Sequence, residues 1–174
     1  MSDAGFDPYV LLEALERERT SYVVIGAFAR VVNGSGETTG ALDIVPSLRD
    51  ENLRRVGRAL DDLDARSTRR GPASVETLAA GEPTGVRTSA GSLKLVPTPW
   101  GTRGYDDLRI RANRENLGRG LRPSIASTVD LVRMLEASTR AADIERLLRL
   151  RRMMELEHEL VRSRRLSRGL SIER

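Results

Sequence analysis

The chain has 174 residues, which is enough for one domain with a hydrophobic core. It contains no cysteine and one histidine, so disulfides, thiolate zinc sites, cysteine nucleophiles and histidine-rich metal centres are excluded. Its net charge is +4, and only 3% of its residues are aromatic, so aliphatic side chains must fill the core.

The positive charge is concentrated near the C-terminus. Residues 140–174 contain ten arginines and six acids, so the rest of the chain is electrically balanced. Such a tail is able to contact nucleic-acid phosphates, but a solvated helix end has the same composition, and we favour that simpler interpretation. Neither a secretory signal nor an apolar run of membrane-spanning length is found, which predicts a cytoplasmic protein with no membrane partner.

The first elements are predicted to be a helix, a strand and a second helix. Asp7 suits the N-cap and Pro8 the first position of a helix that continues through Tyr9 to Arg19. The apolar run Tyr22–Ile25 predicts a strand, and after Gly26 apolar residues recur at helical spacing. A strand therefore turns directly into a helix at this glycine.

A glycine-rich loop at residues 33–36 ends the second helix and leads to a second strand. This strand, Ala41–Val45, alternates around Asp43 and is closed by Pro46. Asp50 then suits the N-cap of an amphipathic helix over residues 51–63.

A hairpin is predicted next, joining Thr84–Thr88 to Ser92–Val96, and its second strand carries Lys94. The only tryptophan, Trp100, follows in a loop rich in proline and glycine. Its ring is able to stack on a base, but a loop tryptophan more often covers a small core, and we favour the latter.

Two helices are predicted to complete the chain. Ser127 opens a capping box for a helix that ends near residue 137, and a long helix follows over residues 141–164. The apolar stripe of this long helix is wider than one core contact needs, which suggests a second copy or an operon partner. We therefore divide the chain into an α/β core, residues 1–126, and a C-terminal helical extension with a basic tail, residues 127–174.

A strand that turns into a helix at a glycine suits nucleotide chemistry. Phosphates can lie at the helix N-terminus, where free N–H groups and the helix dipole favour an anion. Two carboxylates at positions i and i+2 of the next strand point to one face and can share two divalent ions. Such a strand reads Asp-x-Asp, whereas this chain has Ala41-Leu42-Asp43.

Three segments resemble the DNA polymerase β-like nucleotidyltransferase superfamily, and within it small bacterial proteins related to the toxins of type IV abortive-infection toxin–antitoxin systems. They are Gly26-Ala27, Thr39 to Asp43, and Gly91 to Leu95, where the family has a glycine-led helix start, a Thr-x-Asp-x-Asp strand and a third aspartate. Glu51-Asn52-Leu53 also matches the start of the family's next helix. The resemblance implies an α/β nucleotidyltransferase fold, with a mixed β-sheet flanked by helices and a C-terminal helical extension. It also implies a site for magnesium and a nucleoside triphosphate.

Two of the three metal-binding aspartates that the resemblance implies are replaced, by Ala41 and Lys94. Only Asp43 remains, as a metal-binding and catalytic remnant or as a structural residue, and the three positions together carry no net charge. A neutral site has little hold on magnesium, so we hypothesise that Lys94 pairs with Asp43 and supplies part of the missing charge. A lysine that often faces the site in relatives is matched here by Met134 or Leu135. The candidate nucleotide-binding residues are Gly26, Ala27, Thr39 and Lys94.

These features favour a pseudoenzyme of nucleotidyltransferase fold, with a degenerate metal site, that binds a nucleotide or a partner in a toxin–antitoxin or stress module. One alternative is an active metal-dependent nucleotidyltransferase that modifies RNA or protein, using Asp43 with a further carboxylate. The other is a nucleic-acid-binding or interaction protein that acts through the basic C-terminal helix.

Overall fold

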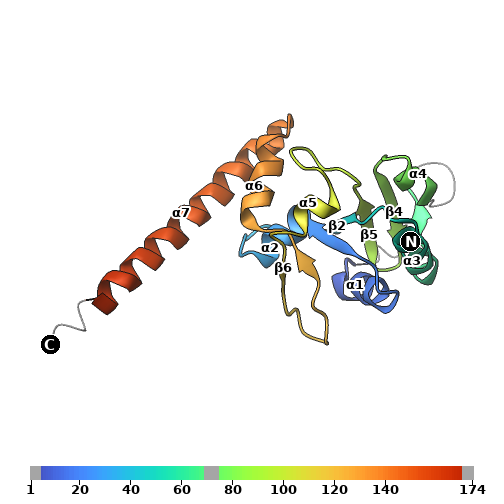
Figure 1. Ribbon diagram of the computed structural model, residues 1–174, viewed down its shortest axis with the longest axis horizontal. Coiled ribbons are helices and arrows are strands. Elements are labelled where there is room, and N and C mark those ends of the chain that lie inside the picture. The colour runs from blue at the N-terminus through green and yellow to red at the C-terminus, as the bar shows by residue number, and fades with distance from the viewer. Residues whose placement is uncertain (1–4, 69–74, 170–174) are drawn as a thin grey trace.

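A mixed sheet organises the protein (Figure 1). The computed structural model describes residues 5–68 and 75–169, without the side chains of residues 166–169. In this part of the chain the sheet has seven strands in the order β3-β4-β5-β2-β1-β7-β6. They are β1 (Tyr22–Ile25), β2 (Ala41–Pro46), β3 (Arg66–Ser67), β4 (Thr84–Thr88), β5 (Gly91–Leu95), β6 (Asn113–Arg114) and β7 (Ser124–Ile125). The mixed sheet with flanking helices confirms the predicted fold class.

The centre of the sheet is formed by β1, β2 and β5. All four residues of β1 are buried, as expected for an apolar run in the middle of a sheet. This strand pairs antiparallel with β2, which pairs parallel with β5. The registers place Ile25 opposite Asp43, and Asp43 opposite Lys94. Gly26, which follows Ile25, therefore lies at the same end of the sheet as these two charged residues.

Helices flank the sheet and hold its central strands. The first and third helices pack together against β2, while the second packs against β1 and β2 and contacts the sixth. The helices are α1 (Pro8–Arg17), α2 (Gly26–Val32), α3 (Asp50–Asp62), α4 (Val75–Ala79), α5 (Tyr105–Leu108), α6 (Thr128–Glu136) and α7 (Ala141–Gly169).

Side-chain caps confirm two of the predicted helix starts. The Asp7 carboxylate accepts a hydrogen bond from the N–H of Tyr9 (3.0 Å), with Pro8 in the first turn. The Ser127 hydroxyl accepts from the N–H of Asp130 (3.1 Å) and donates to its carboxylate (2.9 Å). Short polar side chains therefore set both boundaries by local hydrogen bonding.

One local prediction was wrong, and one short strand was not predicted. Asp50 is the first residue of α3 and Arg49 is its N-cap, with no side-chain capping bond. The short strand β3 was not predicted, because its two polar residues, Arg66 and Ser67, show no hydrophobic alternation and are ordered only by pairing with β4.

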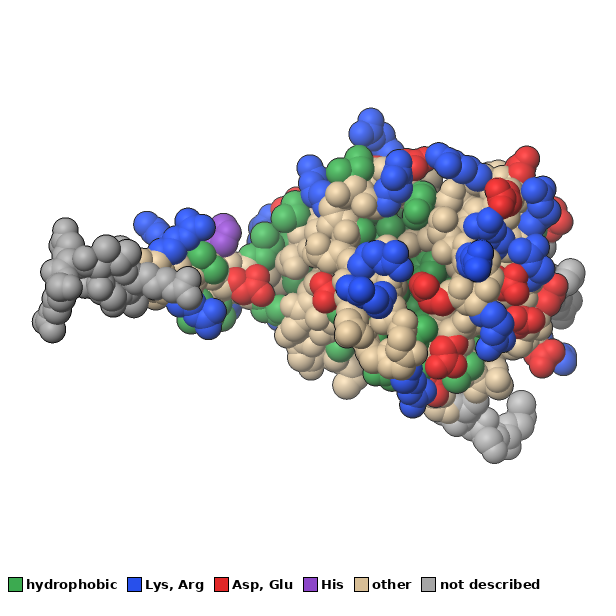
Figure 2. Space-filling model, turned by 60° about the horizontal axis from the view of Figure 1, so that its bottom comes forward, with side chains coloured by type: hydrophobic (Ala, Val, Ile, Leu, Met, Phe, Trp, Pro, Cys, Tyr) green, Lys and Arg blue, Asp and Glu red, His purple; other side chains and the backbone are tan. Residues whose placement is uncertain are grey.

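The last helix, α7, packs against α6 and then projects away from the sheet (Figure 1). Leu150 is buried, whereas Leu156, Leu160 and Val161 are exposed. Figure 2 shows green apolar side chains along this projection, and basic and acidic side chains intermingled over the body. One core cluster includes residues of both α6 and α7, and the division of the chain at residue 126 stays a prediction. No helix in the described ranges is long and apolar enough to cross a bilayer.

Candidate functional site

A pocket of about 420 Å³ opens beside the turn from β1 into α2. Its lining includes four of the predicted site residues, Gly26, Ala27, Asp43 and Lys94. Thr39 does not belong to this lining, and its hydroxyl donates to the carbonyl of Ala41, the first residue of β2 (2.9 Å). The sheet thus gathers residues from separate parts of the sequence into one cavity.

A close contact between Gly26 and Asp43 explains the glycine at the start of α2. Gly26 has a φ of +70°, in the left-handed region, and a Cβ on it would lie 2.6 Å from the Asp43 Oδ2. Both the backbone and the carboxylate therefore oppose any side chain at this position. The Asp43 carboxylate therefore lies directly beside the first residue of α2.

The Asp43 side chain is partly buried, and its carboxylate makes no hydrogen bond or ion pair with the described part of the chain. Burial raises the pKa of its carboxyl, and the charges of Lys94, Arg30 and Arg140 offset part of this rise. The predicted direct pairing of Lys94 with Asp43 does not occur. The two residues are opposite in register, but the Lys94 side chain is exposed and acts on Asp43 only through its electric field.

A buried arginine that carries no signal in the sequence lies at the pocket. Arg30 is 6% exposed, and its guanidinium donates two hydrogen bonds to the Glu37 carboxylate (2.9 and 2.7 Å). The Ser35 hydroxyl donates a third (2.9 Å). The bonds from Arg30 hold the pKa of Glu37 below its usual range. The Glu37 carboxylate is therefore engaged by Arg30 and Ser35 and is not free to act as a metal ligand.

The pocket lining has a net charge of +2, from four cations and two carboxylates. Arg30 and Arg146 are each held by a carboxylate. Among the described side chains, Lys94 and Arg140 have no such ion pair, and the guanidinium of Arg140 lies over the ring of Trp100, 5.0 Å from its centroid. The sequence did not reveal Arg140 because it lies far from the motif residues along the chain.

The carboxylates of this pocket do not fit the two shared magnesium ions of a transferase, which need carboxylates free to bridge them. Of the two described carboxylates that line the cavity, Asp43 and Asp143, the latter has both oxygens engaged by hydrogen bonds from Ser138 and Arg146. Burial alone would raise the pKa of Asp143, but hydrogen bonds from Ser138 and Arg146 lower it below its usual range. No three His, Cys, Asp or Glu side chains of residues 5–68 and 75–169 lie close enough together to hold a metal.

Apolar side chains form much of the rest of the cavity wall. Met134 and Leu135 of α6, the positions where the resemblance implies a lysine, both line it. Trp100 lines it as well and is 49% exposed, so the expectation that this ring covers the core is wrong. The pocket therefore combines an apolar, aromatic part with a cationic part.

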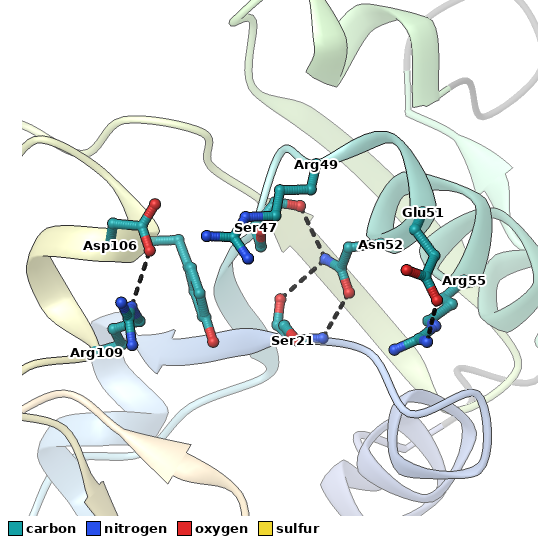
Figure 3. A pocket seen from close by; sticks show the side chains of 9 residues that line it. Ser21, Ser47, Arg49, Glu51, Asn52, Arg55, Asp106 and Arg109 are labelled. Carbon is teal, nitrogen blue, oxygen red and sulfur yellow. Dashed lines mark hydrogen bonds and ion pairs between the residues drawn. The ribbon is translucent and has the colours of Figure 1, made fainter.

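A second pocket, of about 250 Å³, lies at the other end of β1 and β2 (Figure 3). Asn52 at its wall is 5% exposed and bonds to both strand ends. Its Oδ1 accepts from the N–H of Ser21 (2.6 Å), and its Nδ2 donates to the carbonyls of Ser21 (3.0 Å) and Ser47 (2.8 Å). Two ion pairs, Arg55 with Glu51 and Arg109 with Asp106, complete the polar wall. The hydrogen bonds of Asn52 at this pocket therefore join α3 to the ends of the two strands.

The raised pKa of Asp43 predicts a stability effect in Asp43→Asn. A carboxyl whose pKa is higher in the folded state binds its proton more tightly there, so the folded state loses stability as pH rises from the unfolded pKa through the folded one. The asparagine variant lacks this loss. Its melting temperature relative to the wild type is expected to be higher at pH 8 than at pH 4, measured by thermal unfolding. If the melting temperatures of variant and wild type differed by the same amount at both pH values, the raised pKa of Asp43 would be contradicted.

Comparisons with known proteins agree with the topology. No protein-family model matches the chain, and no curated protein sequence matches it. Two solved structures of the antibiotic-resistance factor ANT(2'')-Ia are similar in fold, with TM-scores of 0.54 and 0.55 and 13% identity. The aligned parts cover 95% and 93% of this chain, and 92% and 96% of those chains.

A third similar structure is TM1012 of Thermotoga maritima, described as a candidate nucleotidyltransferase. Its TM-score is 0.51 at 13% identity, over 85% of this chain and 90% of that one. The pocket lies beside the turn from β1 into α2, which is where the resemblance in the sequence implies a glycine-led helix and an aspartate strand. The protein has the fold of the nucleotidyltransferase superfamily.

Proposed function

We propose that the protein binds a nucleotide in the pocket beside Gly26 and Asp43 without a divalent ion, and that it transfers no nucleotidyl group. The carrying observation is that Lys94 and Arg140 line this pocket with no ion-pair partner among the described carboxylates. Cations at these places supply the positive charge that metal ions give to phosphates in a transferase. They do not replace the ions in activating an attacking oxygen.

An adenine nucleotide is the first ligand to test. One of the similar structures holds adenylyl-2''-tobramycin, the product of joining an adenylyl group to an aminoglycoside. Aminoglycosides are polycations, and a pocket lining of net charge +2 repels them. We therefore propose the nucleotide as a ligand of this chain and do not propose the antibiotic.

We further propose that the nucleotide-bound form acts in a toxin–antitoxin or stress module in the cytoplasm. The support is the resemblance in the motifs around Gly26, Asp43 and Lys94 to small toxin-related proteins. In such a module, a protein that binds a nucleotide without turnover is able to sense the nucleotide concentration. Alternatively, it binds its protein partner only when the nucleotide is bound.

The test is binding of ATP to the full chain by calorimetry, in EDTA and in magnesium, with labelled ATP to follow covalent transfer. We expect saturable binding that persists in EDTA, and no transfer. Lys94→Asp is expected to weaken binding at least about tenfold, or about 1.4 kcal/mol, because it places a negative charge beside the phosphates. Lys94→Arg keeps the charge and is the matched control. Lys94 is the only lysine of the chain, so protection of its amine from acylation by ATP locates the ligand directly.

Other results would favour the alternatives. Metal-dependent transfer of label by the wild type would show an active enzyme and overturn the proposal. Absence of nucleotide binding, together with strongly salt-dependent binding of duplex DNA or RNA, would favour the projecting part of α7. A nucleic-acid-binding function of α7 is favoured by three exposed arginines on this part of the helix. Within the described ranges no ion pair is found for them; they are Arg162, Arg164 and Arg165.

A further inference from the structure

Trp100 presents its aromatic ring to the pocket. It lies in the loop between β5 and α5, is 49% exposed, and lines the same cavity as Asp43 and Lys94. It belongs neither to the buried core nor to the partly buried side chains packed on it. An exposed indole at the mouth of a cavity adds little to the stability of the fold and is available to a ligand.

The loop holds this ring in place. Gly101 has a φ of +73°, and a Cβ on it would lie 2.9 Å from both the Arg133 carbonyl oxygen and the Ala137 Cβ, so the loop is packed tightly on the end of α6. Thr102 bonds back to the carbonyl of Pro99 through its N–H (3.1 Å) and its hydroxyl (2.9 Å). The ring is therefore presented by an ordered turn, which limits the entropy lost when a ligand binds.

Arg140 connects the aromatic and the charged parts of the cavity. Its guanidinium lies 5.0 Å from the centre of the Trp100 ring, and its charge is also felt by the carboxyl of Asp43. Pro99 and Met134 add apolar groups to the lining of the same cavity, and Lys94 adds positive charge. A ligand with a planar aromatic group and a chain of phosphates matches this combination.

We infer that Trp100 is the base-stacking platform of the nucleotide site. The inference rests on the proposed function, since it requires that the pocket bind a nucleotide. It adds that residues 97–104 determine how much the base contributes to affinity. Stacking uses the face that all bases share, so the site distinguishes nucleotides from base-free polyphosphates more strongly than it distinguishes one base from another.

The test uses the full chain, whose only tryptophan is Trp100, so that intrinsic fluorescence reports this site alone. ATP, GTP and inorganic tripolyphosphate are titrated in EDTA, with fluorescence and calorimetry followed in parallel. We expect both nucleotides to quench the fluorescence with the same midpoint as calorimetry, and tripolyphosphate to bind without comparable quenching. Trp100→Leu is expected to weaken ATP about tenfold and to leave tripolyphosphate unchanged, while Trp100→Phe retains most of the affinity.

Two results would overturn the inference in different ways. If ATP binds no more tightly than tripolyphosphate, and Trp100→Leu leaves its affinity unchanged, the stacking role is wrong while the proposed function stands. If neither ATP nor tripolyphosphate binds, the proposed function fails and the inference fails with it. Circular dichroism of each variant checks that the fold is intact, as expected for a half-exposed side chain.

Discussion

Asn52→Ala is expected to lower the free energy of unfolding by about 2 to 4 kcal/mol, although Asn52 lies outside the candidate nucleotide site. Its amide joins α3 to the ends of β1 and β2 through three hydrogen bonds (Figure 3). Without it, the N–H of Ser21 and the carbonyl of Ser47 lose their side-chain partner, and Ser47 is 4% exposed. The Ser21 carbonyl still accepts from the N–H of Ser47 (2.9 Å). Two orphaned groups therefore set the size of the effect.

Chemical denaturation of Asn52→Ala measures this loss, and Glu51→Ala is the matched control. Glu51 is the preceding residue on α3, but its ion pair with Arg55 is exposed, so its removal is expected to change stability by less than about 1 kcal/mol. Equal losses in the two variants would show that water from the neighbouring pocket replaces the amide.

Gly26→Ala is expected to destabilise the protein by a similar amount, about 2 to 4 kcal/mol. A left-handed backbone costs about 1 to 2 kcal/mol once a Cβ is present. The new methyl group also meets the Asp43 carboxylate and forces it to move, which adds an overpacking penalty of about 1 to 3 kcal/mol. The variant is also expected to bind ATP more weakly, because the pocket wall changes.

A double-mutant cycle separates the two contributions. In the Asp43→Ala background the methyl group no longer meets a carboxylate, so Gly26→Ala is expected to lose at least about 1 kcal/mol less than in the wild type. Gly81→Ala is a control for the backbone alone, since Gly81 has a φ of +83° and a Cβ there meets nothing within 4 Å. Additive effects of the two substitutions would mean that the contact at Gly26 does not constrain the site.

Local chemistry determined the elements of this fold. The apolar run of β1, the caps Asp7 and Ser127, and the hairpin before Trp100 are each encoded within a few neighbouring residues. The short motifs around Gly26 and Asp43 indicated the fold, because a strand, a glycine and an aspartate strand must follow one another closely in the chain. The resemblance in the same motifs predicts that the site lies there and that two of its carboxylates are replaced, and both statements stay predictions.

Only the tertiary structure decided what surrounds the remaining aspartate. Lys94 is opposite Asp43 in register, yet its exposed side chain makes no direct pair with it, which depends on side-chain direction and not on spacing. Arg30 belongs to α2 and Arg140 to the loop between α6 and α7, far apart in the sequence, and neither position shows a periodicity or motif that marks it. The exposure of Trp100 likewise depends on how its loop packs on α6. The sequence by itself determined the helices and strands, because backbone propensities depend on neighbouring residues. The charge and the lining of the pocket depend on contacts between segments distant in the chain, and local sequence patterns do not contain this information.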